Sequence, residues 1–174
     1  MKIFKLFLFT AFISLTISCS KDDDNPTINN NGNIVGVWKG TAVDYTGNTT
    51  TSGQGQNITA TYVGEAYDID YTLTFTENPQ KVISDGSYSI ELTTTVNGQT
   101  TTQNVEGLTF LESGDWTMNA NTLSITVDNE TNDASIMELT DNTLVLKAVE
   151  SQTMSQGGFT VTSTTEVILS FTKQ

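Results

Sequence analysis

The sequence predicts an all-β protein whose folded part is an antiparallel up-and-down β-barrel of about eight strands. The first observation is the alternation from Tyr67 to Thr76, where every odd position is apolar and every even position is polar. This pattern is typical of a strand with one buried and one solvated face. The second is a series of turn-forming pairs, of which Asn97-Gly98 is the strongest hairpin signal. The third is that no ten-residue segment beyond the N-terminal leader shows a convincing helical period.

The N-terminal leader, residues 1–18, has the features of a signal peptide. Lys2 and Lys5 precede an apolar run at residues 6–17. A helix needs about 20 apolar residues to cross a bilayer, and this shorter run is followed at once by polar chain. We therefore expect residues 1–18 to be removed from the mature protein.

The only cysteine of the sequence, Cys19, follows this leader directly. Residues 15–19 resemble the lipobox of bacterial lipoproteins, although Thr16 stands where leucine is usual. The resemblance implies that Cys19 carries acyl chains such as palmitate and anchors the protein to the outer membrane. One acyl chain binds a membrane weakly, whereas two or more anchor a protein stably. The alternative is that Cys19 is only a small apolar residue of the leader.

The acidic run after Cys19, residues 20–24, resembles the export signal that brings lipoproteins of Bacteroidota to the cell surface. That resemblance implies that the protein faces the cell exterior, and the alternative is a solvated spacer. Residues 25–33 are rich in asparagine and turn formers and lack periodicity. We therefore predict a lipid-anchored flexible tether at residues 19–33 and a single folded domain at residues 34–174.

Composition excludes several classes of partner. Without the leader, the sequence contains five lysines and 20 acidic residues, which gives a net charge of −15. It has no arginine or histidine. Affinity for nucleic acid comes largely from basic contacts to phosphate, so we expect no nucleic-acid binding. We also expect a monomer that needs no cofactor.

The turn signals divide the folded part into ten short segments, at residues 34–45, 57–63, 66–76, 81–96, 99–111, 114–118, 122–127, 134–140, 143–150 and 158–172. Gly64 and Gly114 stand where a bulge could bend one continuous strand. Merging across both glycines leaves eight strands, which suit a closed barrel or a sandwich. The Gly-, Thr- and Gln-rich residues 46–56 are expected to form a long loop. Most of the 32 threonines fall on the predicted outer faces, where a β-branched polar side chain suits a solvated sheet.

The first predicted strand contains Gly36-Val37-Trp38, which resembles the Gly-x-Trp opening of lipocalins. Together with residues 114–118, 121–125 and 136–146, it is similar to the lipocalin-like domains of bacterial lipoproteins, over roughly residues 34–173. By alternation, Ile34, Gly36, Trp38, Gly40 and Ala42 are expected to share one face of this first strand. The resemblance implies a barrel closed at one end by Trp38. In lipocalins an arginine packs on that tryptophan. Because this chain has no arginine, Lys173 or apolar packing must take its place.

Candidate binding residues are the large aromatic side chains expected to line the barrel. An eight-stranded barrel either holds one small ligand or is filled by its own side chains, and the sequence leaves both alternatives open. Tyrosines could offer hydroxyls to a ligand or could close the pocket. The candidate set is Trp38, Tyr62, Tyr67, Tyr71, Phe75, Tyr88, Trp116 and Phe159.

Catalytic and metal-binding residues are not expected. No histidine is present to act as a base at neutral pH. Asp68 and Asp70 share the polar side of their strand, and the acidic residues 128–133 lack the glycine and glutamate of a calcium loop. The two remaining functions are an anchored binder of a small apolar or amphipathic molecule, and a surface interaction module with a filled barrel that uses residues 46–56.

Overall fold

The computed structural model describes residues 30–174, so the predicted leader, Cys19 and most of the tether lie outside the described residues. The described part forms one antiparallel sheet, and none of it is helical, so it contains no helix long and apolar enough to cross a membrane. The strands are β1 Gly36–Gly53, β2 Gln56–Glu77, β3 Gln80–Val96, β4 Gln99–Leu108, β5 Gly114–Asn119, β6 Thr122–Val127, β7 Glu130–Leu139, β8 Thr143–Gln156 and β9 Phe159–Lys173.

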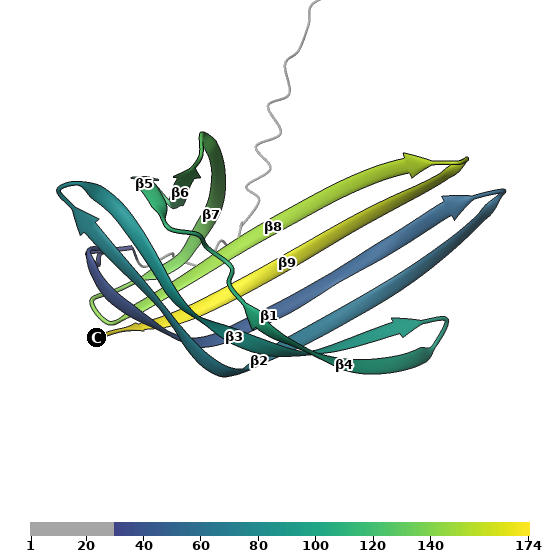
Figure 1. Cartoon of the computed structure of the whole chain (residues 1–174), viewed down its shortest axis with the longest axis horizontal. Coiled ribbons are helices and arrows are strands. Elements are labelled where there is room, and N and C mark those ends of the chain that lie inside the picture. The colour runs from purple at the N-terminus through teal and green to yellow at the C-terminus, as the bar shows by residue number, and fades with distance from the viewer. Residues whose placement is uncertain (1–29) are drawn as a thin grey trace, which may run out of the picture.

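Eight of the nine strands close into a ring. The sheet order is β2-β1-β9-β8-β7-β6-β5-β3-β4, and β2 also pairs with β3. The ring therefore contains every strand except β4, which lies outside it against β3 (Figure 1). Neighbouring strands of the ring follow one another along the chain apart from this one interruption, which confirms the predicted up-and-down barrel.

The longest strands extend beyond the ring. β5 and β6 have six residues each, whereas β1 has 18 and β2 has 22. Because each residue adds about 3.3 Å to a strand, the short strands limit the height at which the ring can close. Beyond that height β4, β3, β2, β1, β9 and β8 continue as an open six-stranded sheet, which we call the extension, and which projects to one side of the barrel in Figure 1.

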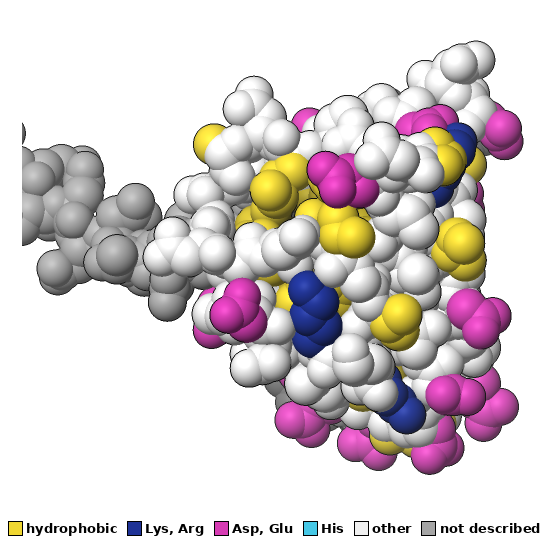
Figure 2. All heavy atoms as spheres, turned by 90° about the vertical axis from the view of Figure 1, so that its left-hand side faces the viewer, with side chains coloured by type: hydrophobic (Ala, Val, Ile, Leu, Met, Phe, Trp, Pro, Cys, Tyr) yellow, Lys and Arg dark blue, Asp and Glu magenta, His cyan; other side chains and the backbone are white. Residues whose placement is uncertain are grey.

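The core fills the ring on the side away from the extension. Its fully buried side chains come from β1, β2, β3 and β6 to β9, and the largest are Trp38, Tyr71, Tyr88, Phe75 and Phe171. No polar or charged side chain is fully buried among the described residues. Seen from the barrel end, acidic side chains gather along the lower and right-hand border, and the lysines are scattered singly, as expected for this composition (Figure 2).

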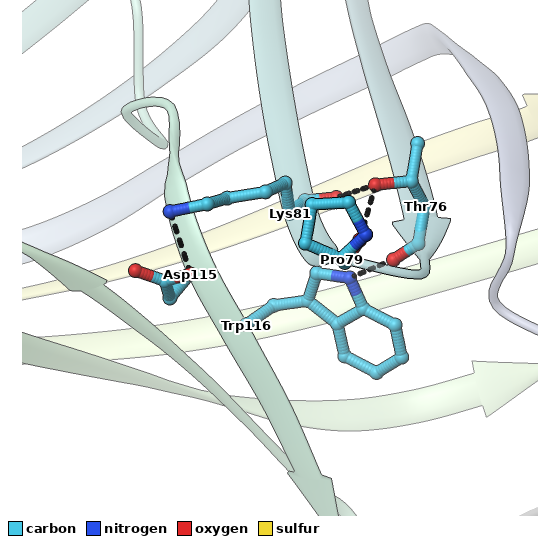
Figure 3. Close-up of polar contacts among 5 residues, drawn as sticks. All are labelled: Thr76, Pro79, Lys81, Asp115 and Trp116. Atoms are coloured by element: carbon cyan, nitrogen blue, oxygen red, sulfur yellow. Dashed lines mark hydrogen bonds and ion pairs between the residues drawn. The ribbon is translucent and has the colours of Figure 1, made fainter.

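The shortest strand pairing in the ring is that between β3 and β5, which share only the pairs Lys81–Asp115 and Val82–Gly114. Side chains support this junction (Figure 3). The Lys81 ammonium lies 2.7 Å from the Asp115 carboxylate, and Trp116 Nε1 donates a hydrogen bond of 2.8 Å to the Thr76 carbonyl. The Trp116 ring also packs edge-on against Phe75, with centroids 5.8 Å apart. An ion pair, a hydrogen bond and an aromatic contact thus join β5 to β2 and β3 where the ladder is short.

The turn chemistry is confirmed where the sequence signal was strongest. Asn97 and Gly98 have φ angles of 50° and 78°, as a two-residue hairpin with both central residues left-handed requires. β2 is also one continuous strand across Gly64. Its register shift lies further on, between Tyr67 and Asp70, where Asp68 has a φ of 50°.

Three local predictions are wrong. Gly114 does not continue the preceding strand, because residues 109–113 leave the sheet and separate β4 from β5. Residues 46–56 are not a long loop but the paired ends of β1 and β2, joined by a tight turn at Gln54-Gly55. Ala42 does not share the inner face with Trp38, because a register shift between Gly40 and Ala42 places Val43 in the core instead.

Candidate functional site at the barrel mouth

The end of the barrel opposite the extension is closed by Trp38. Its side chain is 0% exposed, and Nε1 donates a hydrogen bond of 2.6 Å to the Ile34 carbonyl. The Lys173 ammonium lies 5.0 Å from the centre of the Trp38 ring and donates to the Asn33 carbonyl at 2.7 Å. Lys173 therefore provides the cation–π contact that the missing arginine would make. The buried Trp38 ring therefore fills the barrel interior at this end.

The middle of the barrel is filled by hydrogen-bonded tyrosines. The Tyr71 hydroxyl donates to the Leu111 carbonyl and accepts from the Leu111 amide, both at 3.0 Å, and the Ser84 hydroxyl donates to it at 3.2 Å. The Tyr88 ring lies edge-on to Tyr71, with centroids 5.8 Å apart, and its hydroxyl shares a hydrogen bond with Tyr45. Burial raises the pKa of Tyr45, Tyr71 and Tyr88, so these hydroxyls stay neutral at physiological pH.

Tyr71→Phe is expected to lower the free energy of unfolding by about 1–3 kcal/mol, because the buried Leu111 amide and carbonyl lose their partner. Leu111 belongs to the segment that separates β4 from β5, so this segment should also exchange its amide hydrogens faster. Urea unfolding and hydrogen exchange measure the two effects. Tyr62→Phe, whose hydroxyl lies on the extension, is the control and should cost less.

On the side of the tyrosines away from Trp38, a pocket of about 350 Å³ opens at the other end of the barrel, which we call the mouth. It exists because β7 and β8 pair only as far as Ser135–Lys147 and then diverge. The β6–β7 hairpin forms one wall, β8 forms another, and the link between β4 and β5 forms the third. The apolar lining residues are Phe110, Leu111, Ile125, Val127, Ala134, Ala148 and Val149, and the polar ones are Glu112, Thr131, Asn132, Asp133 and Glu150.

The eight candidate residues from the sequence do not line this pocket. Trp38, Tyr71, Phe75, Tyr88 and Trp116 lie in the packed core. Tyr62 is half-buried on the extension. Its ring covers Gly47, where an added Cβ would lie 2.4 Å from the ring.

Tyr67 and Phe159 lie away from the barrel interior. The register shift after Tyr67 gives the inward position to Ala66, which packs against the core. Phe159 lies at the far end of the extension over Gly53 and is 43% exposed. The pocket residues that the candidate set missed are mostly small or medium-sized, such as Ala134 and Ala148. An alanine at an inward position beside larger ones is the signal that could have indicated free space.

The inner and outer faces of the extension differ. The inner face continues the barrel lining and carries exposed apolar side chains, including Ile58 and Met154. The outer face carries cross-strand hydroxyl pairs, such as Thr50–Thr59 and Thr93–Thr102. Within residues 30–174, no group of three or more His, Cys, Asp or Glu side chains is placed to hold a metal ion.

A closed antiparallel ring of eight strands with one packed end and one open mouth defines a small up-and-down β-barrel. The model of the lipocalin-like domain family matches residues 34–146, and the chain belongs to that family. The match runs from the segment before β1 into β8, so β9, which completes the ring, lies beyond it. No curated protein and no solved structure matches the chain.

Proposed function

We propose that this protein is a membrane-anchored binder of a small apolar or amphipathic molecule, held in the pocket at the barrel mouth. The observation that carries the proposal is the pocket itself, which is lined by apolar and polar side chains from three separate parts of the chain. Its volume of about 350 Å³ falls within the range typical of small-molecule sites. The apolar part of the lining favours the removal of a hydrocarbon body from water, at about 25 cal/mol per Å².

The pocket is tested by filling it. Ala148 is buried but does not belong to the main core cluster, so Ala148→Phe should occupy the pocket without disturbing the core. With the neutral apolar dye N-phenyl-1-naphthylamine as probe, we expect binding to residues 25–174, which contain every strand, and a loss of about tenfold or more in the variant. Fluorescence titration measures both.

Thr153→Phe is the matched control, because Thr153 lies further along β8 on the outer face of the extension. It should bind the dye as the unmodified chain does. Equal binding by all three proteins, with unchanged melting temperatures, would place the dye elsewhere and contradict the pocket as the site.

The anchor is proposed at Cys19, on the outer membrane and facing the cell exterior. Cys19→Ser is expected to move the protein from the detergent phase to the aqueous phase in a phase-partition experiment, because the acyl chains are lost. Mass spectrometry of the mature N-terminus checks for the lipid. A Cys19→Ser protein that still partitions with detergent would contradict the anchor, and resistance of the domain to protease added to intact cells would contradict exposure at the surface.

A second candidate function is a surface interaction module. The observation that favours it is the extension, where β4 and the outer half of β8 each have an unpaired edge. Neither of these edge segments contains the lysine or proline that commonly protects an exposed edge from pairing with another chain. In this function the barrel is only a support, and the mouth pocket binds nothing.

A further inference from the structure

Carboxylates border the mouth pocket, and two of them have no cationic partner among residues 30–174. Glu150 follows Ala148 on the inner face of β8, two positions on, so its side chain points the same way as that of the pocket alanine. Glu112 borders the pocket from the link between β4 and β5. Asp133 also lies there, but its carboxylate accepts a hydrogen bond of 2.6 Å from the Ser124 hydroxyl.

The lysines of the described chain are elsewhere. Lys81 pairs with Asp115 and Lys147 with Glu166, at 2.7 and 2.6 Å. Lys173 covers the Trp38 ring at the opposite end of the barrel. The fourth lysine in residues 30–174, Lys39, is on β1 and does not line the pocket. A ligand that enters the mouth therefore meets an apolar floor and a negatively charged border.

We infer that the mouth pocket selects amphipathic molecules with a cationic end, such as an alkylammonium group, and disfavours fatty-acid carboxylates. This inference rests on the proposed function, because it concerns the ligand of the same pocket. The apolar body lies against Ile125 and Ala134, and the cation lies between Glu112 and Glu150. Like charges repel an anionic ligand and attract a cationic one, and because Glu112 and Glu150 are both exposed, salt screens this effect.

Three probes with the same ten-carbon chain separate charge from hydrophobicity. Decylammonium, decanol and decanoate compete with N-phenyl-1-naphthylamine for residues 25–174 at neutral pH and low salt. We expect decylammonium to displace the dye at about tenfold lower concentration than decanoate, with decanol between them. The preference should shrink at high salt.

The double variant Glu112→Gln/Glu150→Gln should reduce the ratio of the decylammonium and decanoate affinities at least about fivefold and leave decanol unchanged. The control, Glu77→Gln/Glu106→Gln, changes the net charge equally but lies at the β2–β3 turn and on β4. It should keep the ratio.

The outcomes distinguish the two proposals. If decanol and the dye bind but decanoate competes as well as decylammonium, or both double variants change the ratio equally, the inferred selectivity is overturned and the pocket stands. If neither the dye nor decanol binds, the proposed function fails and the inference fails with it.

Discussion

Replacement of Gly86 by alanine is expected to lower the free energy of unfolding by more than about 3 kcal/mol. Gly86 lies opposite Tyr71 in the β2–β3 ladder, beside the register shift of β2, and has a φ of 81°. An added Cβ would lie 1.7 Å from the Asp70 carbonyl oxygen, which is backbone and cannot rotate away. The variant must therefore break the pairing at the point that aims Tyr71 into the barrel. Urea unfolding followed by tryptophan fluorescence measures the loss.

Gly98→Ala is the matched control for Gly86→Ala. Gly98 has nearly the same backbone, with a φ of 78°, but an added Cβ meets nothing within 4 Å. It should cost only about 1 kcal/mol, from the unfavourable backbone conformation alone. Equal losses in the two variants would contradict the close approach of β2 and β3 at the register shift.

Removal of the Trp38 ring should destabilise the protein almost as strongly as Gly86→Ala does. Trp38→Ala deletes a fully buried side chain, so the transfer and cavity terms together should cost about 3–5 kcal/mol. The variant also leaves the Ile34 carbonyl without its hydrogen-bond donor and Lys173 without its aromatic partner. Denaturant unfolding measures the change, and the remaining Trp116 still reports it.

Lys173→Met measures the contribution of the cation–π contact apart from that of the buried Trp38 ring. The Trp38–Lys173 contact alone should contribute about 0.5–2 kcal/mol. A phenylalanine ring attracts a cation less strongly than a tryptophan ring does. In the Trp38→Phe variant, Lys173→Met should therefore lower the free energy of unfolding by less than it does in the unmodified protein. A purely additive pair of substitutions would mean that the lysine contributes through its stem or its bond to Asn33 rather than through the ring.

The fold could be predicted from the sequence because alternation and turn chemistry are local signals. The alternation before Phe75 places Tyr71 and Leu73 in the core, and the Asn97-Gly98 pair fixes its own hairpin. The break between β4 and β5 before Gly114 could not be predicted. The two strands pair with different parts of β3, and this pairing depends on long-range packing. Residues 46–56 resemble a loop in composition, yet their threonines pair across strands and lengthen the sheet.

The site was harder to predict than the fold. Large aromatic residues on the inner face are a clear sequence signal, but large side chains fill space, and five of the eight candidates form the core. A pocket is space that side chains leave empty, which depends on where strands diverge. The separation of β7 and β8 beyond the Ser135–Lys147 pair has no local sequence signal, and only the small residues Ala134 and Ala148 indicate it in retrospect.

Native mass spectrometry of residues 25–174, after exposure to an extract of the source cells, tests whether the barrel mouth binds a ligand. We expect a non-covalent adduct of a few hundred daltons, retained by the unmodified domain and lost from Ala148→Phe. A bare protein mass in both cases, with no gain in melting temperature from any of the ten-carbon probes, would contradict a ligand-binding mouth. That result would favour the interaction module built on the open edges of β4 and β8.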